Sequence, residues 1–392
     1  MRGLDTLKEK AIAAVEAHRR ELIDLSLKIH AHPETAFGEI KAARWLTEYL
    51  EGNGFAVERG ICLLETAFRA SSGDRAPRVA LLAEYDALPG IGHGCGHNLI
   101  AMASVGAGIA AKAVLAEAGG SVVIIGTPAE EAAGGKALMA TRGAFDGLDA
   151  ALLTHPGNRN ASVTHGLACI ELTVEYHGKA SHAAARPEAG VNALDALVIA
   201  YNSISVLRQH IRDSARIHGI ITDGGQAANV VPEHAAAFFL VRAKDDEYLD
   251  RLRPRVLACF RAGAEATGAR LEYRWGDDTR YRAMRSNHAL AEVYARNMET
   301  LGRQMNDVEE RHSMGSTDMG NVSALVPAIH PTVAIAPPDI LIHTPQLREV
   351  AASEEALETM LDAAKAMAMT VVDVLTDADL RQRMQEEFRD RS

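Results

Sequence analysis

The stretch Gly92-His93-Gly94-Cys95-Gly96-His97-Asn98 places a thiol, two imidazoles and a carboxamide among three glycines, directly before a helical pattern that begins at Leu99. Glycine admits positive φ angles and sharp bends, so the side chains of such a loop can converge on one point. Asn98 can cap the following helix, whose N-terminal dipole favours a nearby thiolate or other anion. Taken alone, the stretch also fits a glycine-rich turn around a buried structural cysteine, and the rest of the chain has to decide.

The size and charge of the chain exclude several classes of protein. A chain of 392 residues with 47% hydrophobic content can bury a large core and form two domains. The net charge of -11 leaves no basic surplus for phosphates, so we expect no nucleic-acid partner. The segment Met1 to Lys10 lacks an apolar signal-peptide core, so we expect a cytoplasmic protein. Leu99 to Leu115 falls short of the ~20 residues that span a bilayer, so we expect a buried helix and no membrane partner.

Short apolar runs alternate with helical patterns in the first part of the chain. Leu4 to Glu34 and Ile40 to Gly52 carry apolar residues at helical spacing. Continuous apolar runs follow at Val79 to Ala83, Val122 to Gly126 and Ala150 to Thr154. Apolar strands separated by helices indicate a mainly parallel sheet that is covered on both faces.

Side chains that can bind metal follow each of these apolar runs. Glu84 and Asp86 come after the first run, Glu130 and Glu131 after the second, and His155 after the third. In open α/β sheets, ligands bind outside the carboxyl ends of the strands. One site can therefore collect all of these side chains.

The pattern changes at about Leu167, where a second order of elements begins. The expected elements are a strand at Cys169 to Tyr176, a helix at Val191 to Gln209, strands at Ile217 to Thr222 and Ala235 to Arg242, a helix at Asp246 to Gly268 and a strand at Arg270 to Trp275. This order is that of a small split βαβ unit. Its sheet edge offers a surface for a homodimer.

The last part of the chain returns to the first pattern. It contains a helical stretch at Asn287 to Leu301, a strand at Thr332 to Ala336 and a closing helix at Ser353 to Thr376. We therefore predict an α/β protein with a mainly parallel-sheet catalytic domain, formed by residues 1–167 and 284–392. A smaller α+β ferredoxin-like domain of residues 168–283 is inserted into it as a lid or dimerisation domain.

Thiolate, imidazole and carboxylate are ligands of borderline divalent metals. The chain supplies all three kinds in Cys95, His97, Glu131, His155 and His343, the last of which follows the final expected strand. This is more than one tetrahedral ion needs, whereas two ions roughly 3.5–4 Å apart that share a ligand can use the whole set. Such mixed donors favour two Zn²⁺ or Mn²⁺ ions per chain and also accept Co²⁺ or Ni²⁺.

The adjacent carboxylates Glu130 and Glu131 can divide the chemical work. One can bind metal while the other takes a proton from the attacking water, whose pKa a metal lowers toward ~7. Paired glutamates also occur at solvated helix starts. Their position at a strand end, after Thr127-Pro128, favours the catalytic interpretation.

The inserted segment carries its own polar cluster, formed by His182, Asn229 and Arg242. Histidine and asparagine can donate hydrogen bonds to a developing oxyanion, and arginine can hold a carboxylate with two parallel hydrogen bonds. Each of these residues alone would also fit a polar surface. The pattern becomes informative only together with the motifs of the whole chain.

The motifs of the chain resemble those of the M20 family of metallopeptidases and amidohydrolases, in its aminoacylase-like branch. That branch holds β-alanyl-lysine-type dipeptidases, aminobenzoyl-glutamate hydrolases and auxin-conjugate hydrolases. The motifs that carry the resemblance are His32-Pro33-Glu34, Ala83-Glu84-Tyr85-Asp86-Ala87-Leu88-Pro89, Gly94-Cys95-Gly96-His97-Asn98, Pro128-Ala129-Glu130-Glu131, His177-Gly178-Lys179-Ala180-Ser181-His182, Asn229-Val230-Val231-Pro232 and His343-Thr344-Pro345.

The resemblance implies a role for each candidate. The metal candidates named above would hold a binuclear site, with Glu130 as general base and acid. Asp86 would orient one of the ligands. His182 would donate to the oxyanion, often across a dimer interface, while Asn229 and Arg242 would hold the substrate carboxylate.

Three further features of the sequence bear on the subgroup. Asn98 stands where many relatives carry aspartate, and Glu84 stands where other branches place a metal-binding histidine. Both departures match the dipeptidase-like members better than the carboxypeptidases. The block Gly315 to Asn321 resembles a substrate-side loop of those members.

These observations predict a metal-dependent hydrolase that cleaves the amide bond of an N-acyl amino acid or a small dipeptide-like substrate. One alternative is a thiol amidase with Cys95 as nucleophile and His97 as base, which leaves Glu130, Glu131 and His155 without a role. Another is a non-catalytic homologue that binds a small molecule. A carboxylate such as Glu130, with no metal to bind, has no purpose in a pure binder.

Overall fold

In the computed structural model, which describes residues 2–306 and 315–390, the chain divides into two units. Unit 1 is formed by Met1–His165 and Met284–Ser392, and unit 2 by Gly166–Ala283. The first junction thus lies between residues 165 and 166, whereas the sequence pattern places it between 167 and 168.

A six-stranded sheet forms the centre of unit 1. Its strands, in spatial order, are β1 (Ala56–Arg59), β2 (Phe68–Ser72), β4 (Ser121–Gly126), β3 (Arg78–Ala83), β5 (Ala150–Leu152) and β11 (Ala328–Ile329). The strands β4, β3, β5 and β11 pair in parallel, whereas β1 and β2 extend the sheet by antiparallel pairing. The predicted mainly parallel sheet is therefore confirmed, with an antiparallel edge that the sequence pattern did not indicate.

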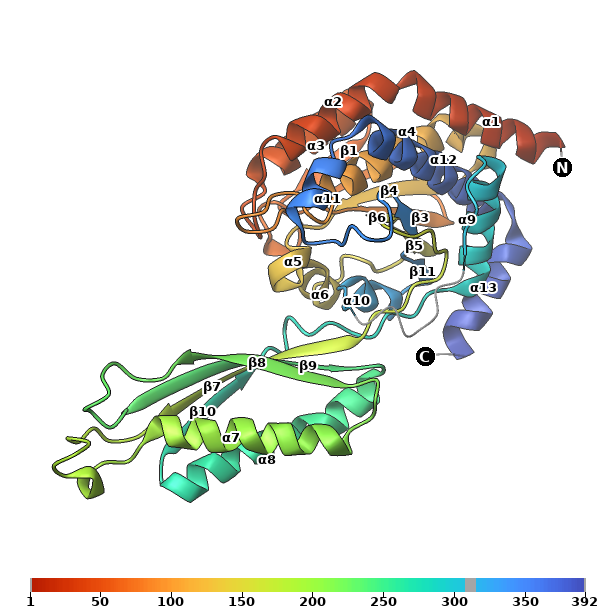
Figure 1. The fold of residues 1–392 in the computed structure, drawn as a ribbon. Helices are drawn as coiled ribbons and strands as arrows, with labels where there is room; N and C mark the ends of the chain where they lie inside the picture. Colours follow the sequence, from red (N-terminus) through yellow and green to blue (C-terminus); the bar gives the residue numbers. More distant parts are fainter. Residues whose placement is uncertain (1, 307–314, 391–392) are drawn as a thin grey trace. The chain divides into compact units, whose positions relative to one another are not determined.

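Helices cover both faces of this sheet (Figure 1). The helices of unit 1 are α1 (Arg2–Ala17), α2 (Arg19–His30), α3 (Ile40–Gly52), α4 (His97–Ala118), α5 (Glu130–Ala133), α6 (Gly135–Thr141), α9 (His288–Thr300), α10 (Met319–Ser323), α11 (Pro345–Val350), α12 (Glu354–Thr376) and α13 (Ala378–Asp390). Leu81 of β3 points into the core that holds α4 and α12, while its neighbour Leu82 points into the core that holds α6 and α10. This alternation buries both faces of β3 and explains its continuous apolar sequence.

Helix α4 is the buried helix predicted around Leu99 to Leu115, and it is longer than expected, with 22 residues. By length and composition alone it could cross a membrane, but 78% of its apolar window is buried inside the protein. A Cβ atom at Gly108 would lie 2.3 Å from Cδ1 of Ile124 on β4. Glycine therefore allows α4 to lie close against the sheet.

Two of the expected elements differ from the structure. The helix expected over Leu4 to Glu34 is wrong as a single element, because the chain breaks at His18 between α1 and α2. The strand expected at Thr332 to Ala336 does not join the main sheet. As β12 (Thr332–Ala334) it pairs with β6 (His155–Gly157) in a separate two-stranded ladder.

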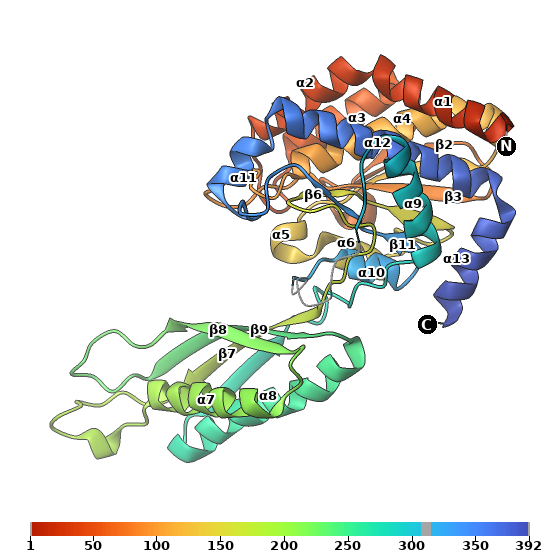
Figure 2. The same cartoon turned by 45° about the vertical axis from the view of Figure 1, so that its right-hand side comes forward.

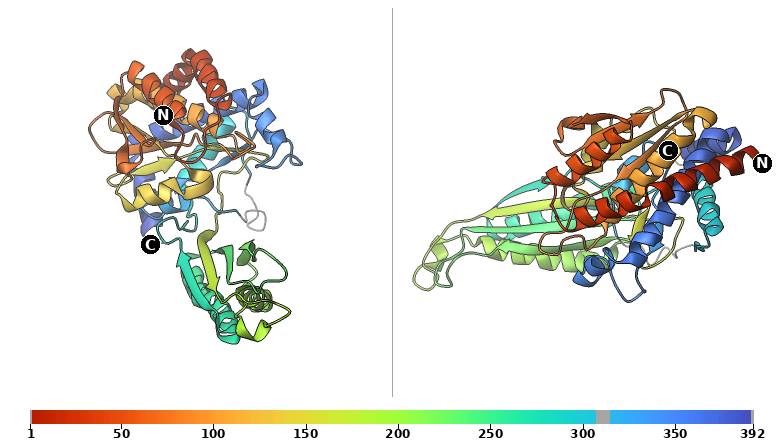
Figure 3. Two further views of the ribbon diagram at one scale, coloured as in Figure 1. Left: turned by 90° about the vertical axis from the view of Figure 1, so that its left-hand side faces the viewer. Right: turned by 90° about the horizontal axis from the view of Figure 1, so that it is seen from above.

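Unit 2 is an antiparallel four-stranded sheet in the order β10-β7-β9-β8 with two helices on one face (Figures 2 and 3). Its elements are β7 (Ala168–His177), α7 (Ala193–Leu207), β8 (Arg216–Asp223), β9 (His234–Ala243), α8 (Asp246–Thr267) and β10 (Arg270–Trp275). Along β7, alternate residues from Ile170 to Tyr176 are buried under the helices, and the residues between them are partly exposed. The predicted ferredoxin-like order of elements is confirmed.

Candidate metal centre

The Cys95 loop ends at the N-terminus of α4, which begins at His97. Gly96 has a φ of +83°, and a Cβ atom there would lie 2.7 Å from Cγ of Pro156 on β6. Only glycine fits both this backbone conformation and this close approach. The loop therefore holds Cys95 and His97 against the segment that carries His155.

The predicted metal ligands of unit 1 lie together. Sγ of Cys95 is 3.4 Å from Nε2 of His155, and Nε2 of His97 is 3.8 Å from Oε1 of Glu131. The other carboxylate oxygen of Glu131 is 3.3 Å from Nε2 of His343. Two groups of donor atoms result, Cys95 with His97 and His155 and Cys95 with Glu131 and His343, and within each group the atoms lie within 4.8 Å of one another. Cys95 is common to both groups.

The donor atoms fit divalent metal ions. Nε2 of His97 and Oε1 of Glu131 are buried and make no hydrogen bond. Buried polar atoms in proteins nearly always have a partner, so these two atoms need one that the protein chain does not supply. Sulfur, imidazole nitrogen and carboxylate oxygen are the donors that borderline divalent ions accept.

Hydrogen bonds on the far side of the ligands fix their orientation. Nδ1 of His97 lies 2.9 Å from Oδ1 of Asp86, and Oδ2 of Asp86 accepts from the backbone N–H of Glu131 at 3.0 Å. Nδ1 of His155 donates to the carbonyl oxygen of Pro156 at 2.6 Å. Both imidazoles therefore turn Nε2 toward the donor groups, as histidine ligands of metals do.

Burial and neighbouring charge set the protonation of the metal-free donors. Burial raises the pKa of the Cys95 thiol well above its ordinary value. A buried thiol of this kind is a poor nucleophile, which argues against the thiol-amidase alternative. Burial alone would lower the pKa of His97, but Asp86 and Cys95 raise it well above its ordinary value.

A strained residue directs the two adjacent glutamates. Ala129 has a φ of +61°, and its backbone N–H donates to Oε1 of the buried Glu39 at 2.9 Å. Such a conformation persists only where the surroundings hold it. It begins α5 so that a carboxylate oxygen of Glu130 lies within 4.8 Å of donor atoms of both His97 and Glu131. Burial, with the charges of Glu84 and Asp318, raises the pKa of Glu130 well above its ordinary value.

A buried ionic network lies beside Glu130. Nζ of Lys136 is 2.5 Å from Oε1 of Glu84 and 2.6 Å from Oδ1 of Asp318, and all three side chains have 0% exposure. Burial alone would raise the pKa of Glu84, but Lys136 and His97 hold it at about 2. Sequence reasoning did not predict Lys136. The available signal was a single lysine in the otherwise apolar helix Gly135–Thr141, directly after two glycines.

His330 is a second residue that sequence reasoning missed. Its ring centroid is 5.4 Å from that of His155, and its Nε2 is buried without a hydrogen bond. Burial, with the neighbouring His155, lowers the pKa of His330 to about 3, so the ring is neutral at pH 7. The adjacent Pro331 accepts the backbone hydrogen bond of His155 and brings the two rings together.

The predicted substrate-binding residues belong to unit 2. His182 is bridged to Val230, next to Asn229, so these two predicted residues lie on neighbouring segments. Nδ1 of His182 accepts from the backbone N–H groups of Ala184 and Ala185 at 3.3 and 3.2 Å. The ring proton then lies on Nε2, where it can be donated. Arg242 lies near the opposite end of β9 and is paired with Cys169 of β7.

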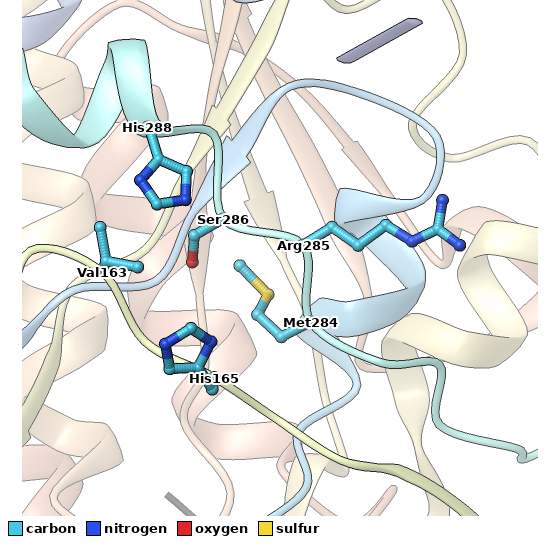
Figure 4. A pocket seen from close by; sticks show the side chains of 6 residues that line it. All are labelled: Val163, His165, Met284, Arg285, Ser286 and His288. Carbon is cyan, nitrogen blue, oxygen red and sulfur yellow. The ribbon is translucent and has the colours of Figure 1, made fainter. Parts of the chain in front are cut away.

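A cavity of about 360 Å³ lies elsewhere in unit 1. It is lined by Val163, His165, Met284, Arg285, Ser286 and His288. Figure 4 shows the rings of His165 and His288 on either side of Ser286, with the side chain of Arg285 directed away from them. None of these residues is among the predicted site residues, so the donor groups and the cavity are separate features of the described chain.

The comparison with known families agrees with the geometry of this site. The sequence profile of peptidase family M20/M25/M40 matches residues 80–370. The chain belongs to this family. The resemblance seen in the motifs of this M20 hydrolase is therefore confirmed.

Two relatives of this M20 hydrolase match it along nearly the whole chain. It is 40% identical over 403 residues to a Xaa-Arg dipeptidase of Mus musculus, and the alignment covers 98% of this chain and 93% of that protein. It is 32% identical over 453 residues to one of the two chains of p-aminobenzoyl-glutamate hydrolase of Escherichia coli, with 95% and 93% covered. These relatives place the chain among the dipeptidases and amidohydrolases.

Solved structures share the fold of the M20 hydrolase. A dinuclear metal-binding peptidase of the M20 family from Bacillus subtilis matches with a TM-score of 0.71 at 21% identity, over 92% of this chain and 99% of that chain. The aminobenzoyl-glutamate utilization protein of Klebsiella pneumoniae matches with a TM-score of 0.72 at 17% identity, over 93% and 98%. The predicted fold class is confirmed by these neighbours.

Proposed function

We propose that this M20 hydrolase cleaves the amide bond of a small dipeptide or N-acyl amino acid with two divalent metal ions. Cys95, His97, Glu131, His155 and His343 would hold the ions. The observation that supports the proposal is the convergence of these donors on buried atoms without hydrogen bonds, next to Glu130. Zn²⁺ or Mn²⁺ suits this donor set, and Co²⁺ or Ni²⁺ would also bind.

Glu130 would move the protons of the reaction. When bound, the two ions would polarise the scissile carbonyl and lower the pKa of an attacking water. Glu130 would accept a proton from that water as its oxygen attacks the carbonyl carbon. It would then return the proton to the leaving amine as the carbon–nitrogen bond breaks. Glu131 keeps its oxygens for the ions, since its backbone is held by Asp86.

Unit 2 would contribute substrate-binding groups. His182 would donate from Nε2 to the developing oxyanion, and Asn229 and Arg242 would hold the substrate carboxylate. Closure of unit 2 over the substrate would bring these groups to the reacting bond. We further propose that the protein acts in the cytoplasm as a homodimer.

The first substrates to test are dipeptides that end in arginine. The proposal of this class rests on the relative from Mus musculus, whose name specifies Xaa-Arg dipeptides and which matches 98% of this chain. p-Aminobenzoyl-glutamate and N-acetyl amino acids serve as comparison substrates, because they carry an amide bond but no basic side chain.

The decisive experiment compares Glu130→Gln with the wild type. We expect the variant to retain the metal content of the wild type and to lose amide hydrolysis, because glutamine cannot accept the proton. Glu58→Gln, at an exposed carboxylate of β1, is the matched control and should hydrolyse at the wild-type rate. Near-normal turnover by Glu130→Gln would refute the proposed role. Tight ligand binding without turnover by the wild type, across the amide panel, would favour a non-catalytic binding protein.

A further inference from the structure

The open face of the sheet in unit 2 carries a compact group of ionisable residues. His177 on β7 is paired directly with His234 on β9, and Glu175 on β7 is paired with Glu272 on β10. These side chains leave the sheet on the face opposite the helices, since the buried residues of β7 alternate with them. Strand pairing therefore fixes the positions of the group, so no flexible loop has to assemble it.

The side-chain atoms converge. Nε2 of His234 is 3.1 Å from Oε2 of Glu175, and Nε2 of His177 is 3.9 Å from the same oxygen. One donor atom from each of these three residues lies within 4.8 Å of the other two. Zinc bonds of about 2.0–2.1 Å in a tetrahedral site separate the ligand atoms by about 3.3 Å, so small side-chain movements would complete such a site.

The fourth position also has a candidate. Oε2 of Glu272 lies 3.5 Å from Nε2 of His177. Its other oxygen is paired with Arg270, which leaves Oε2 directed toward the group. Two imidazoles and two carboxylates are a ligand set that suits Zn²⁺.

Asp223 holds one of the histidines in the orientation of a metal ligand. Its Oδ2 is 2.7 Å from Nδ1 of His234. A histidine that binds metal through one nitrogen usually donates its other ring N–H to a carboxylate. Nε2 of His234 is thereby turned toward Glu175.

Two observations favour a cation over a simple network of ion pairs. Nε2 of His177 is buried and makes no hydrogen bond, although carboxylates lie on two sides of it. The carboxylates of Glu175, Asp223 and Glu272 also exceed the single fixed positive charge of Arg270 among these residues. A divalent cation would satisfy the nitrogen and balance the charge.

We propose that Glu175, His177 and His234, with Glu272 as a further ligand and Asp223 as a positioning residue, form a Zn²⁺-class metal site in unit 2. The site is separate from the donors of unit 1 and shares no residue with them. Its ion would link β9 to β7 and β10 at one end of the sheet, where β7 and β9 otherwise meet through backbone pairing.

The test measures zinc per chain in the full-length protein. Metal-free wild type, the double variant His177→Gln/His234→Gln and the control double variant His210→Gln/His218→Gln are dialysed against the same buffered ZnCl₂, and bound zinc is measured by mass spectrometry. The control removes two exposed histidines of unit 2 that lie outside the group. We expect the first variant to bind one zinc ion per chain less than both other proteins, as one four-coordinate site requires.

Equal zinc content in all three proteins would overturn the proposal. If the double variant fails to fold, Glu175→Gln is used in its place, because its side chain is 45% exposed and its loss leaves the core intact. Asp223→Asn separates positioning from ligation. It should weaken zinc binding at this site about 10–100-fold without changing the number of ions bound at saturation. Unchanged zinc affinity in Asp223→Asn would refute the positioning role.

Discussion

Oδ1 of Asp86 lies 2.9 Å from Nδ1 of His97, and both side chains are buried. The second carboxylate oxygen of Asp86 accepts from the backbone N–H of Glu131. One aspartate therefore positions an imidazole ligand and a carboxylate ligand that come from different elements of unit 1. This contact links the end of β3, the start of α4 and the start of α5 at one point.

Asp86→Asn should weaken metal binding while the fold is retained. Asparagine has nearly the same shape but lacks the negative charge that orients His97, and loss of such a partner typically costs about 10–100-fold in metal affinity. Competition against a chromophoric chelator measures the effect. Asp74→Asn, at an exposed aspartate, is the control and should leave the affinity unchanged. Wild-type affinity in Asp86→Asn would show that Asp86 has no part in orienting the ligands.

Metal binding should release protons from Cys95 and His97. In the metal-free chain, burial raises the pKa of Cys95, and Asp86 raises the pKa of His97 against the effect of burial. Both groups therefore carry a proton at pH 7, whereas metal needs the thiolate and the neutral imidazole. We expect about two protons to be released, and the apparent metal affinity to increase as pH rises.

Calorimetric titration with Zn²⁺ in two buffers of different ionisation enthalpy measures this release. Cys95→Ser should release about one proton fewer, because serine has no thiol proton to lose. Cys259→Ser is the control, since this cysteine lies in unit 2 outside the metal ligands. Equal proton release by wild type and Cys95→Ser would mean that the thiol does not bind metal.

The candidate metal ligands could be predicted because they follow apolar runs that the sequence shows clearly. Cys95, His97, Glu131 and His155 stand after strand ends or in the glycine-rich loop. The position of His155 in β6, outside the main sheet, could not be predicted. It depends on backbone pairing with Thr332, and the apolar runs around each residue resemble strands of one sheet.

The buried network around Lys136 could not be predicted for a different reason. Its partner Asp318 lies 182 residues away in the sequence, and neither residue is unusual in its local context. The edge strands β1 and β2 were missed because they are short and β1 is largely exposed, so neither forms a continuous apolar run. Features that depend on distant partners became visible only in the folded chain.

Lys136→Met should destabilise unit 1 strongly. Removing the lysine leaves Glu84 and Asp318 buried without their counter-charge, and breaking a buried ion pair in this way costs about 3–5 kcal/mol. Urea denaturation of the metal-free protein at pH 7 measures the change in the free energy of unfolding. Lys10→Met is the control, since Lys10 and Glu117 are about half exposed (47% and 54%). Such surface pairs contribute about 0–1 kcal/mol. Similar losses in both variants would contradict the importance of the buried network.

Glu39→Gln should stabilise the protein at neutral pH. Burial raises the pKa of Glu39 from 4.5 to about 7, so the folded state favours the protonated carboxyl. Because the pKa of the folded state is the higher one, the wild type has this contribution in full below about pH 4.5 and loses it as pH rises toward about 7. The loss amounts to about 3 kcal/mol, at about 1.4 kcal/mol for each pKa unit.

Glutamine at this position keeps the acceptor for the backbone N–H of Ala129, which lies 2.9 Å from the Glu39 carboxylate. Its amide can also donate to the Thr66 hydroxyl, which now donates to Oε2 of Glu39 at 3.0 Å. The free energies of unfolding of both proteins, measured in urea from about pH 4.5 to about pH 8, should therefore diverge as pH rises, with the variant the more stable. Other titrating groups are common to both proteins and cancel in the difference. A difference that stays constant over this range would show that Glu39 does not change its protonation on folding, and that Ala129 is held by a carboxylate that remains charged.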